Sequence, residues 1–308
     1  MATLLYTHPA FNAHEVPPGH VEHAGRYDAV EAALNMPAFD MLERRDPPRA
    51  SQEQIALVHP SAFRNVVEAT APTDGLAQFD MDTFAGPNTL DAVLRAVGGA
   101  CAAVDAIYRG EATNAFIAAR PPGHHAEPER AMGFCVYNGA AISALYARNH
   151  GARRVAVLDF DVHHGNGTEA AFWHDSDAFY ASSHEWPQYP GTGRETDRGA
   201  FDNIANAALP PGADGNAFRR AWGEKLLPAL SDFDPDFIVV SAGFDAHAAD
   251  PLGGLQVTEG DFAWITDEIS AIARDKAAGR MISLLEGGYD LPALASSATA
   301  HVARLLDA

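Results

Sequence analysis

The chain has 308 residues, of which 47% are hydrophobic and 20% charged, so its composition excludes a disordered or fibrous protein and allows a large buried core. The net charge of −20 argues against the nucleic-acid backbone as a direct partner, because phosphate binding needs clustered Lys and Arg. The same charge is compatible with a cationic substrate, and equally with a saline habitat or simple solubility.

The two cysteines, Cys101 and Cys135, are too few for a disulfide framework, which fits a reducing compartment. The first residues lack a basic segment followed by a long apolar one, and no apolar run reaches the roughly 18 residues that span a bilayer. We therefore expect a cytoplasmic protein that does not contact a membrane. The sequence leaves the oligomeric state open, a homo-oligomer included.

From about residue 85 onward, short β-branched runs alternate with longer Ala-rich helical stretches. In chain order we expect a helix at 85–109, a strand at 114–119, a helix at 138–150, a strand at 154–159, a helix at 217–230, a strand at 236–241, a helix at 258–278, a strand at 281–285 and a helix at 291–306. Strands that are apolar throughout and alternate with helices indicate a parallel sheet covered on both faces. Without internal repeats or linkers, residues 1–308 are predicted to form one α/β domain.

Four of the expected strands run directly into polar residues. The segments are 116–125 (FIAARPPGHH), 158–164 (LDFDVHH), 241–245 (SAGFD) and 285–289 (LEGGY). Ligands of an open parallel sheet bind outside the carboxyl ends of its strands. The sequence therefore predicts that Asp, His, Gly and Tyr residues meet at one edge of the sheet.

Asp161 and His163 lie two residues apart just after a buried strand, and extended backbone directs such residues to the same side. Asp245, at another strand end, adds a third candidate ligand. Two oxygens and one imidazole nitrogen with an open position suit a catalytic Zn²⁺, although other divalent ions accept the same set.

A second Asp-x-His pair, Asp245 and His247, together with Asp250 looks superficially like the binuclear manganese motif of ureohydrolases. That motif needs another acidic cluster with matching spacing, which this sequence lacks. We therefore interpret His247 as a residue of a surface loop.

His124 and His125 follow two prolines and a glycine, a stiff turn that fixes the direction of the two imidazoles. An imidazole is suited to carrying a proton to and from an activated water molecule. Asp159 and Asn166 are candidate partners with different effects, because an acid raises the pKa of its histidine whereas an amide orients the ring without adding charge.

Tyr289 follows two glycines at a strand end, where its hydroxyl can donate to a developing oxyanion. Local sequence is equally compatible with a tyrosine packed at the edge of the sheet with its hydroxyl in water.

Together these segments resemble the class II branch of the histone deacetylases, and the resemblance runs from about His8 to the C-terminus. The motifs that carry it are 120–126, 133–135, 159–168, 241–245, 250–254 and 285–289. The resemblance implies the arginase–deacetylase fold, with an eight-stranded parallel sheet between helical layers.

The resemblance also implies a role for each candidate residue. Its zinc ligands would be Asp161, His163 and Asp245, its general base and acid His125, its electrostatic neighbour His124, and its carbonyl-polarising tyrosine Tyr289. Asn166 is the class II form of a position that is Asp in other branches. A structural potassium ion would be held by Asp159 and Ser182.

The wall of a narrow tunnel for an acylated lysine would comprise Gly133, Phe134, Tyr189 and Leu252, and Asp82 would bind substrate backbone amides. Tyr189 departs from the commoner Phe and adds a hydroxyl at the tunnel mouth. The loose alignment around Asp82 makes it the weakest of these assignments.

The expected function is therefore zinc-dependent hydrolysis of an acetyl or acyl amide, in particular N6-acetyl-lysine, to acetate and a free amine. One alternative is an acetylpolyamine amidohydrolase. Against it, Leu252 stands where the polyamine-selective eukaryotic branch has Glu, and residues 74–83 are too short for the bacterial polyamine insertion. Another alternative is a catalytically silent acyl-lysine binding module, which the intact ligand set and Tyr289 disfavour.

Overall fold

The computed structural model describes residues 2–308, and its centre is a sheet of eight parallel strands in the order β2-β1-β5-β10-β9-β6-β7-β8. The strands are β1 (Ala2–Tyr6), β2 (Glu43–Arg45), β5 (Ala112–Ile117), β6 (Val155–Asp159), β7 (Ala178–Glu185), β8 (Ile204–Leu209), β9 (Phe237–Ala242) and β10 (Met281–Leu285). A separate antiparallel hairpin pairs β3 (Ala77–Gln78) with β4 (Phe84–Ala85).

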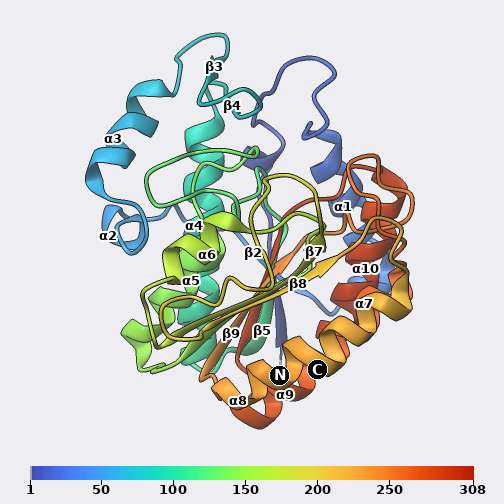
Figure 1. Cartoon of the computed structure of the whole chain (residues 1–308). Coiled ribbons are helices and arrows are strands. Elements are labelled where there is room, and N and C mark those ends of the chain that lie inside the picture. Colours follow the sequence, from blue (N-terminus) through green and yellow to red (C-terminus); the bar gives the residue numbers. More distant parts are fainter. Residues whose placement is uncertain (1) are drawn as a thin grey trace.

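Helices cover both faces of the sheet (Figure 1). One layer consists of α2 (Gln52–Ile55), α3 (Ser61–Thr70), α4 (Thr89–Tyr108), α5 (Gly139–Ala147) and α6 (Asn166–Phe172). The other consists of α1 (Gly25–Leu34), α7 (Gly215–Ala221), α8 (Leu227–Phe233), α9 (Glu259–Lys276) and α10 (Leu291–Asp307). Short 3₁₀ helices occur at Pro9–Phe11, Pro37–Phe39 and Arg148–His150, and a π-helical turn, Trp222–Leu226, joins α7 to α8. Within residues 2–308, no helix combines the length and the hydropathy that crossing a membrane requires.

The central strands are buried on both sides, because each face has its own apolar layer. Along β6, Leu158 packs with the α9–α10 side, whereas Val157 packs with the α4–α5 side. This arrangement explains why the strands read as continuous apolar runs in the sequence. The prediction of an eight-stranded parallel sheet between helical layers is confirmed.

The four strands predicted from apolar runs all exist, with ends within about two residues of those expected. Two helices differ from expectation: the one expected at 85–109 starts at Thr89, and the one at 217–230 is broken by the π-helical turn. Four strands of the sheet, β1, β2, β7 and β8, were not predicted from the sequence. In β7 the reason is physical, because Ser182, Ser183, His184 and Glu185 are polar yet buried.

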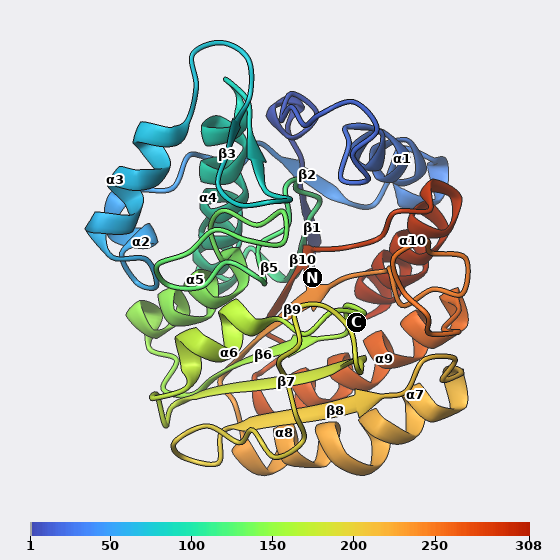
Figure 2. The ribbon, with the colours of Figure 1, turned by 45° about the horizontal axis from the view of Figure 1, so that its top comes forward.

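The four strands that end in polar motifs are direct neighbours in the sheet, in the order β5-β10-β9-β6. Their carboxyl ends, and the loops that follow them, meet above the middle of the sheet, as Figure 2 shows from above. Residues far apart in the chain, such as Gly123 and Glu286, which are separated by 163 positions, are thereby brought within hydrogen-bond distance.

Helix α4 approaches the segment 47–50 closely at Gly98, where a Cβ atom would overlap the backbone of Pro48 and Ala50. We predict that Gly98→Ala lowers the free energy of unfolding by about 1–3 kcal/mol through overpacking. Gly223→Ala is the control, because a Cβ there meets open space and should be neutral or stabilising. Urea unfolding measures both, and a Gly98→Ala protein as stable as wild type would contradict this packing.

Candidate functional site

Asp161, His163 and Asp245 meet just beyond the carboxyl ends of the neighbouring strands β6 and β9. The Nδ1 atom of His163 lies 3.2 Å from Oδ1 of Asp161 and 3.1 Å from Oδ2 of Asp245. One potential ligand atom from each residue lies within 4.8 Å of the others. Elsewhere in residues 2–308, no three His, Cys, Asp or Glu side chains are arranged in this way.

The electrostatics of this cluster call for a cation. Asp161 and Asp245 are both fully buried, and burial together with the charge of Asp161 raises the pKa of Asp245 to about 7. Burial opposes protonation of His163, but its hydrogen bonds to the two carboxylates outweigh it and raise its pKa to about 10. A divalent ion between the three groups would satisfy both carboxylates, so the residues fit a metal with two oxygen ligands and one nitrogen ligand.

Two glycines make room for these carboxylates. A Cβ atom on Gly243 would overlap the carboxylate of Asp161, and one on Gly287 would overlap both carboxylates. The backbone instead supplies donors: Gly287 N–H donates to Asp161 at 2.8 Å, and Val162 N–H donates to Asp245 at 2.8 Å. The glycines after β9 and β10 are therefore part of the geometry of the cluster.

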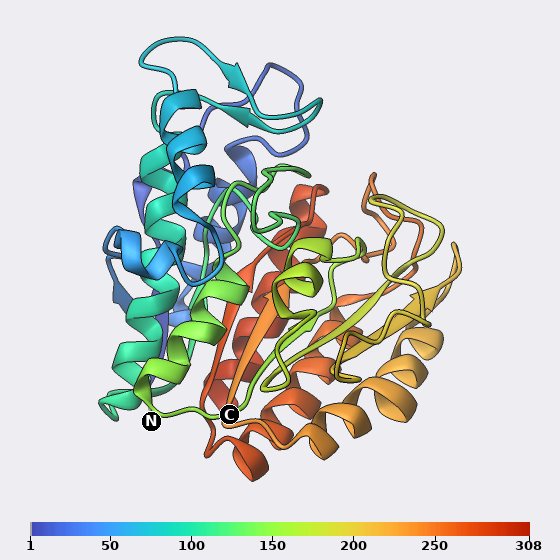
Figure 3. The same cartoon turned by 60° about the vertical axis from the view of Figure 1, so that its left-hand side comes forward.

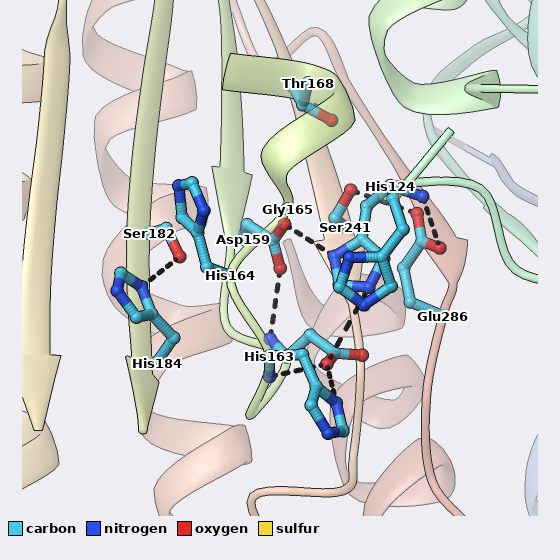
Figure 4. A network of polar contacts seen from close by, with 12 residues as sticks. His124, Asp159, His163, His164, Gly165, Thr168, Ser182, His184, Ser241 and Glu286 are labelled. Atoms are coloured by element: carbon cyan, nitrogen blue, oxygen red, sulfur yellow. Dashed lines mark hydrogen bonds and ion pairs between the residues drawn. The ribbon is translucent and has the colours of Figure 1, made fainter. Parts of the chain in front are cut away.

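His124 and His125 lie side by side, with ring centroids 4.0 Å apart, but they have different partners. Nδ1 of His124 is 2.9 Å from Oδ2 of Asp159, as Figure 4 shows, whereas Nδ1 of His125 is 2.8 Å from Oδ1 of Asn166. Because an amide oxygen only accepts, Nδ1 of His125 carries the proton and its Nε2 is left with a lone pair.

Burial and the neighbouring charges drive the pKa values of the two imidazoles apart. Burial opposes the charged form of His124, yet Asp159 and Asp161 raise its pKa well above the usual value. Burial and the positive charges of His124 and His163 hold the pKa of His125 well below the usual value. The pair therefore differs in its tendency to take up a proton, with the charged form favoured at His124 and the neutral form at His125, the asymmetry that the sequence suggested.

Glu286 holds the turn that carries His124 and His125, a role that was not predicted from the sequence. Its carboxylate accepts hydrogen bonds from the backbone of Gly123 at 2.6 Å and His124 at 3.2 Å, and from Ser241 Oγ at 3.1 Å (Figure 4). Burial raises the pKa of Glu286 to about 7, against the opposing effect of His124.

Tyr289 is held from two sides. Asp250 accepts a hydrogen bond from its backbone N–H at 2.6 Å, and Arg26 donates to Gly288 O at 2.6 Å while its guanidinium lies 4.9 Å from the Tyr289 ring centroid. Asp250 thus anchors a turn and does not belong to a second metal cluster. His247 lies in the loop after β9, 3.5 Å from Glu259, but its side chain is only 13% exposed, so it is less exposed than the surface position expected from the sequence.

A buried group of ion pairs supports the turn at Gly288 and Tyr289, and it was not predicted from the sequence. Glu22 pairs with Arg120 at 2.6 Å and with Arg26 at 2.9 Å, and all three side chains have no exposure to solvent. Two signals were available: the four-residue spacing of Glu22 and Arg26, and a lone Arg at the end of an apolar strand. The same spacing is common on exposed helices, so it is a weak signal.

A cavity of about 210 Å³ leads from the surface to His163. It is lined by Asp82, Pro122, His124, His125, Gly133, Phe134, His163, Gln188, Tyr189, Leu252 and Tyr289. The four residues predicted for the tunnel wall, and Asp82, thus line one cavity with the two histidines and Tyr289. Pro122 and Gln188 were not predicted.

Asp159 and Ser182, the residues assigned to potassium by resemblance, are paired in register across β6 and β7. The Asp159 carboxylate is already engaged by His124 and by Tyr180 Oη at 3.0 Å. Ser182 Oγ lies 2.9 Å from His184 Nδ1 (Figure 4).

Comparisons with known proteins agree on the family. A family profile described as the histone deacetylase domain matches residues 20–305. The chain is 38% identical to histone deacetylase 14, chloroplastic, of Arabidopsis thaliana, over 96% of this chain and 75% of that protein. It is 37% identical to the histone deacetylase-like amidohydrolase of Pseudomonas aeruginosa, over 88% of this chain and 73% of that protein.

Among solved structures, the crystal structure of the HDA15 HD domain superimposes with a TM-score of 0.93 at 32% sequence identity, covering 99% of this chain and 88% of that one. The fold and the family profile together define an α/β protein of the histone deacetylase-like amidohydrolase class. The chain belongs to the histone deacetylase family.

The pairing of His125 with an amide yields a test of the two pKa values. We predict that Asn166→Asp raises the pKa of His125, because a carboxylate replaces a neutral acceptor 2.8 Å from its Nδ1. NMR titration of the imidazole resonances measures the change. Asn35→Asp, which adds the same charge at an exposed position, should leave that pKa unchanged. An unchanged pKa in Asn166→Asp would show that the amide does not set the state of His125.

Proposed function

We propose that this protein is a zinc-dependent deacetylase that hydrolyses acyl amides, in particular N6-acetyl-lysine, to a carboxylate and a free amine. The observation that carries the proposal is that His124, His125 and Tyr289 line one cavity that reaches His163. The surroundings raise the pKa of His124 and lower that of His125. Family membership supports hydrolysis of an acyl amide, and the choice of lysine rests on the wall of the cavity.

Asp161, His163 and Asp245 would hold the Zn²⁺ ion. When bound, the ion would supply Lewis acidity, which polarises the scissile carbonyl and lowers the pKa of a water molecule toward about 7. The resemblance also supports a potassium ion at Asp159 and Ser182.

The remaining groups would move the protons and bind the developing charge. His125 lines the cavity, and its hydrogen bond to Asn166 through Nδ1 leaves the Nε2 lone pair free, so it would take the proton of the attacking water. His124, held in the charged state by Asp159, would stabilise the negative charge that develops in the transition state. The proton taken by His125 would then pass to the leaving amine.

Tyr289 would donate its hydroxyl hydrogen bond to the carbonyl oxygen as that oxygen becomes negative. Burial raises the pKa of Tyr289 well above its usual value, although Arg26 opposes the shift, so the hydroxyl stays protonated and remains a donor. A neutral phenol aimed at a developing oxyanion contributes ~10²–10³ in rate where such donors have been measured.

The cavity wall favours a lysine chain over a polyamine. Leu252 and Phe134 offer apolar surface to methylene groups, and Leu252 offers no partner to a second ammonium group. Asp82 is available at the same cavity to accept hydrogen bonds from substrate backbone amides. The net charge of −20 is the observation that favours acetylpolyamines as a second candidate, because it attracts polycations to the surface.

The metal assignment predicts one divalent ion per chain. Asp245→Ala should lose both the ion and the activity, because the two remaining ligands hold a metal poorly. His247→Ala should keep both. Elemental analysis after dialysis measures the metal content, and two equivalents in wild type, or loss of metal in His247→Ala, would favour a binuclear site instead.

The substrate assignment predicts that an acetyl-lysine peptide exceeds acetylspermidine and acetylputrescine in kcat/KM. Leu252→Glu should shift this ratio toward polyamines by about 10–100-fold, since a partly desolvated carboxylate–ammonium pair contributes roughly 1–3 kcal/mol. Met36→Glu adds the same charge at an exposed position outside the cavity and should not shift the ratio.

These assays should be run at low and high salt, because screening removes long-range attraction of polycations but affects a pocket contact much less. A wild-type preference for acetylpolyamines at high salt would replace the lysine assignment. A metal-loaded protein that binds acetyl-lysine but turns over none of these amides would indicate a binding module.

A further inference from the structure

Phe134, in the wall of the cavity, has a backbone conformation that needs support. Its φ angle is 68°, in the left-handed region that residues other than glycine rarely adopt. Such a conformation persists only where neighbouring groups hold it, and it is most common at functional sites. The groups that hold Phe134 therefore decide the shape of the cavity wall.

Thr83 is one of these groups. Its side chain is fully buried, and its Oγ1 atom accepts the backbone N–H of Phe134 at 3.0 Å and donates to Oδ1 of Asp82 at 3.0 Å. The hydroxyl thus bridges two residues that line the cavity, while Thr83 itself does not line it. Thr83 is fixed in turn, because its backbone carbonyl accepts from Phe79 at 2.8 Å and its N–H donates to Asp80 at 2.9 Å.

His20, in the N-terminal segment, also contacts both Asp82 and Phe134. Its Nδ1 accepts the N–H of Glu22 at 3.1 Å, so its Nε2 carries the proton and donates to the backbone carbonyl of Asp82 at 3.1 Å. The His20 ring also packs edge-on against Phe134, with centroids 4.9 Å apart. Figure 3 shows the β3–β4 hairpin beside the N-terminal segment, above the ends of the sheet strands.

We infer that Thr83 is a positioning residue for substrate selection, which ties the Phe134 wall to Asp82 and so fixes the width of the cavity entrance. The expected effect on substrate binding rests on the proposed function. The hydrogen bonds by which Thr83 links Phe134 to Asp82 do not depend on it. Thr83 makes no hydrogen bond to His124, to His125 or to the cluster of Asp161, His163 and Asp245. Loss of its hydroxyl should therefore weaken substrate binding more than it slows the chemical step.

Thr83→Val is the sharpest test, because it keeps the shape of the side chain and removes both hydrogen bonds. On a fluorogenic acetyl-lysine peptide we expect KM to rise roughly tenfold, the loss expected for a buried N–H left without its acceptor, while kcat stays within about threefold. Thr83→Ser, which restores the hydroxyl, should return KM to within about twofold of wild type. Should Thr83→Val fold poorly, Thr83→Ala carries the same prediction.

Thr266→Val is the matched control. Thr266 is equally buried and makes two hydrogen bonds, to Phe262 O and His301 Nδ1, but it lies on α9, where it contacts α10, and it does not line the cavity. It should lower the stability of the protein without changing KM. A rise in KM in this control would mean that the effect of Thr83→Val reflects general destabilisation.

Hydrogen exchange tests whether Thr83 holds the backbone amide of Phe134, without any assay of turnover. The amide of Phe134 should exchange faster in Thr83→Val than in wild type, and Thr83→Ser should restore its protection. Unchanged exchange, or an unchanged KM alongside faster exchange, would overturn the inference. A wild-type protein without turnover on any acyl amide would refute the proposed function, while the exchange experiment would still decide whether Thr83 holds Phe134.

Discussion

Two carboxylates, Asp161 and Asp245, lie at the ends of neighbouring strands with no exposure to water, and the surrounding structure is organised around their charge. Backbone donors on Gly287 and Val162, and the His163 imidazole, all point at them. Two buried like charges so close together are unfavourable unless a cation balances them. Gly243 and Gly287, which leave room for the two carboxylates, and the backbone donors beside them meet this requirement.

Balance of charge also explains the groups behind the cluster. Asp159 helps to raise the pKa of His124, burial and the charges of His124 and His163 lower the pKa of His125, and Glu286 holds the turn that carries both imidazoles. The carboxylate of Asp159 adds a negative charge beside His124, whereas the amide of Asn166 adds none beside His125, so burial and the neighbouring positive charges dominate there. Each polar group therefore works through the protonation state of a neighbour as well as through its own contacts.

The central part of the fold could be predicted from the sequence because its strands are apolar on both faces and end in polar motifs. Proximity of Asp161, His163 and Asp245 followed from that pattern, and the residues of the tunnel wall followed from the resemblance. Strand β7 could not be predicted, because its second half, Ser182 to Glu185, is buried yet polar and is satisfied by hydrogen bonds to other side chains and to loops. The ion pairs of Glu22 were equally hidden, since their partner Arg120 lies 98 positions away.

The floor and the wall of the cavity come from different parts of the molecule. Its floor sits on four neighbouring strands locked in the sheet, whereas Asp82, Phe134, Tyr189 and Leu252 belong to a hairpin and to loops outside it. Loops tolerate insertion and replacement far better than packed strands do. Evolution can therefore exchange the residues that choose a substrate while the reacting groups remain in place, so relatives with the same chemistry can diverge in what they act upon.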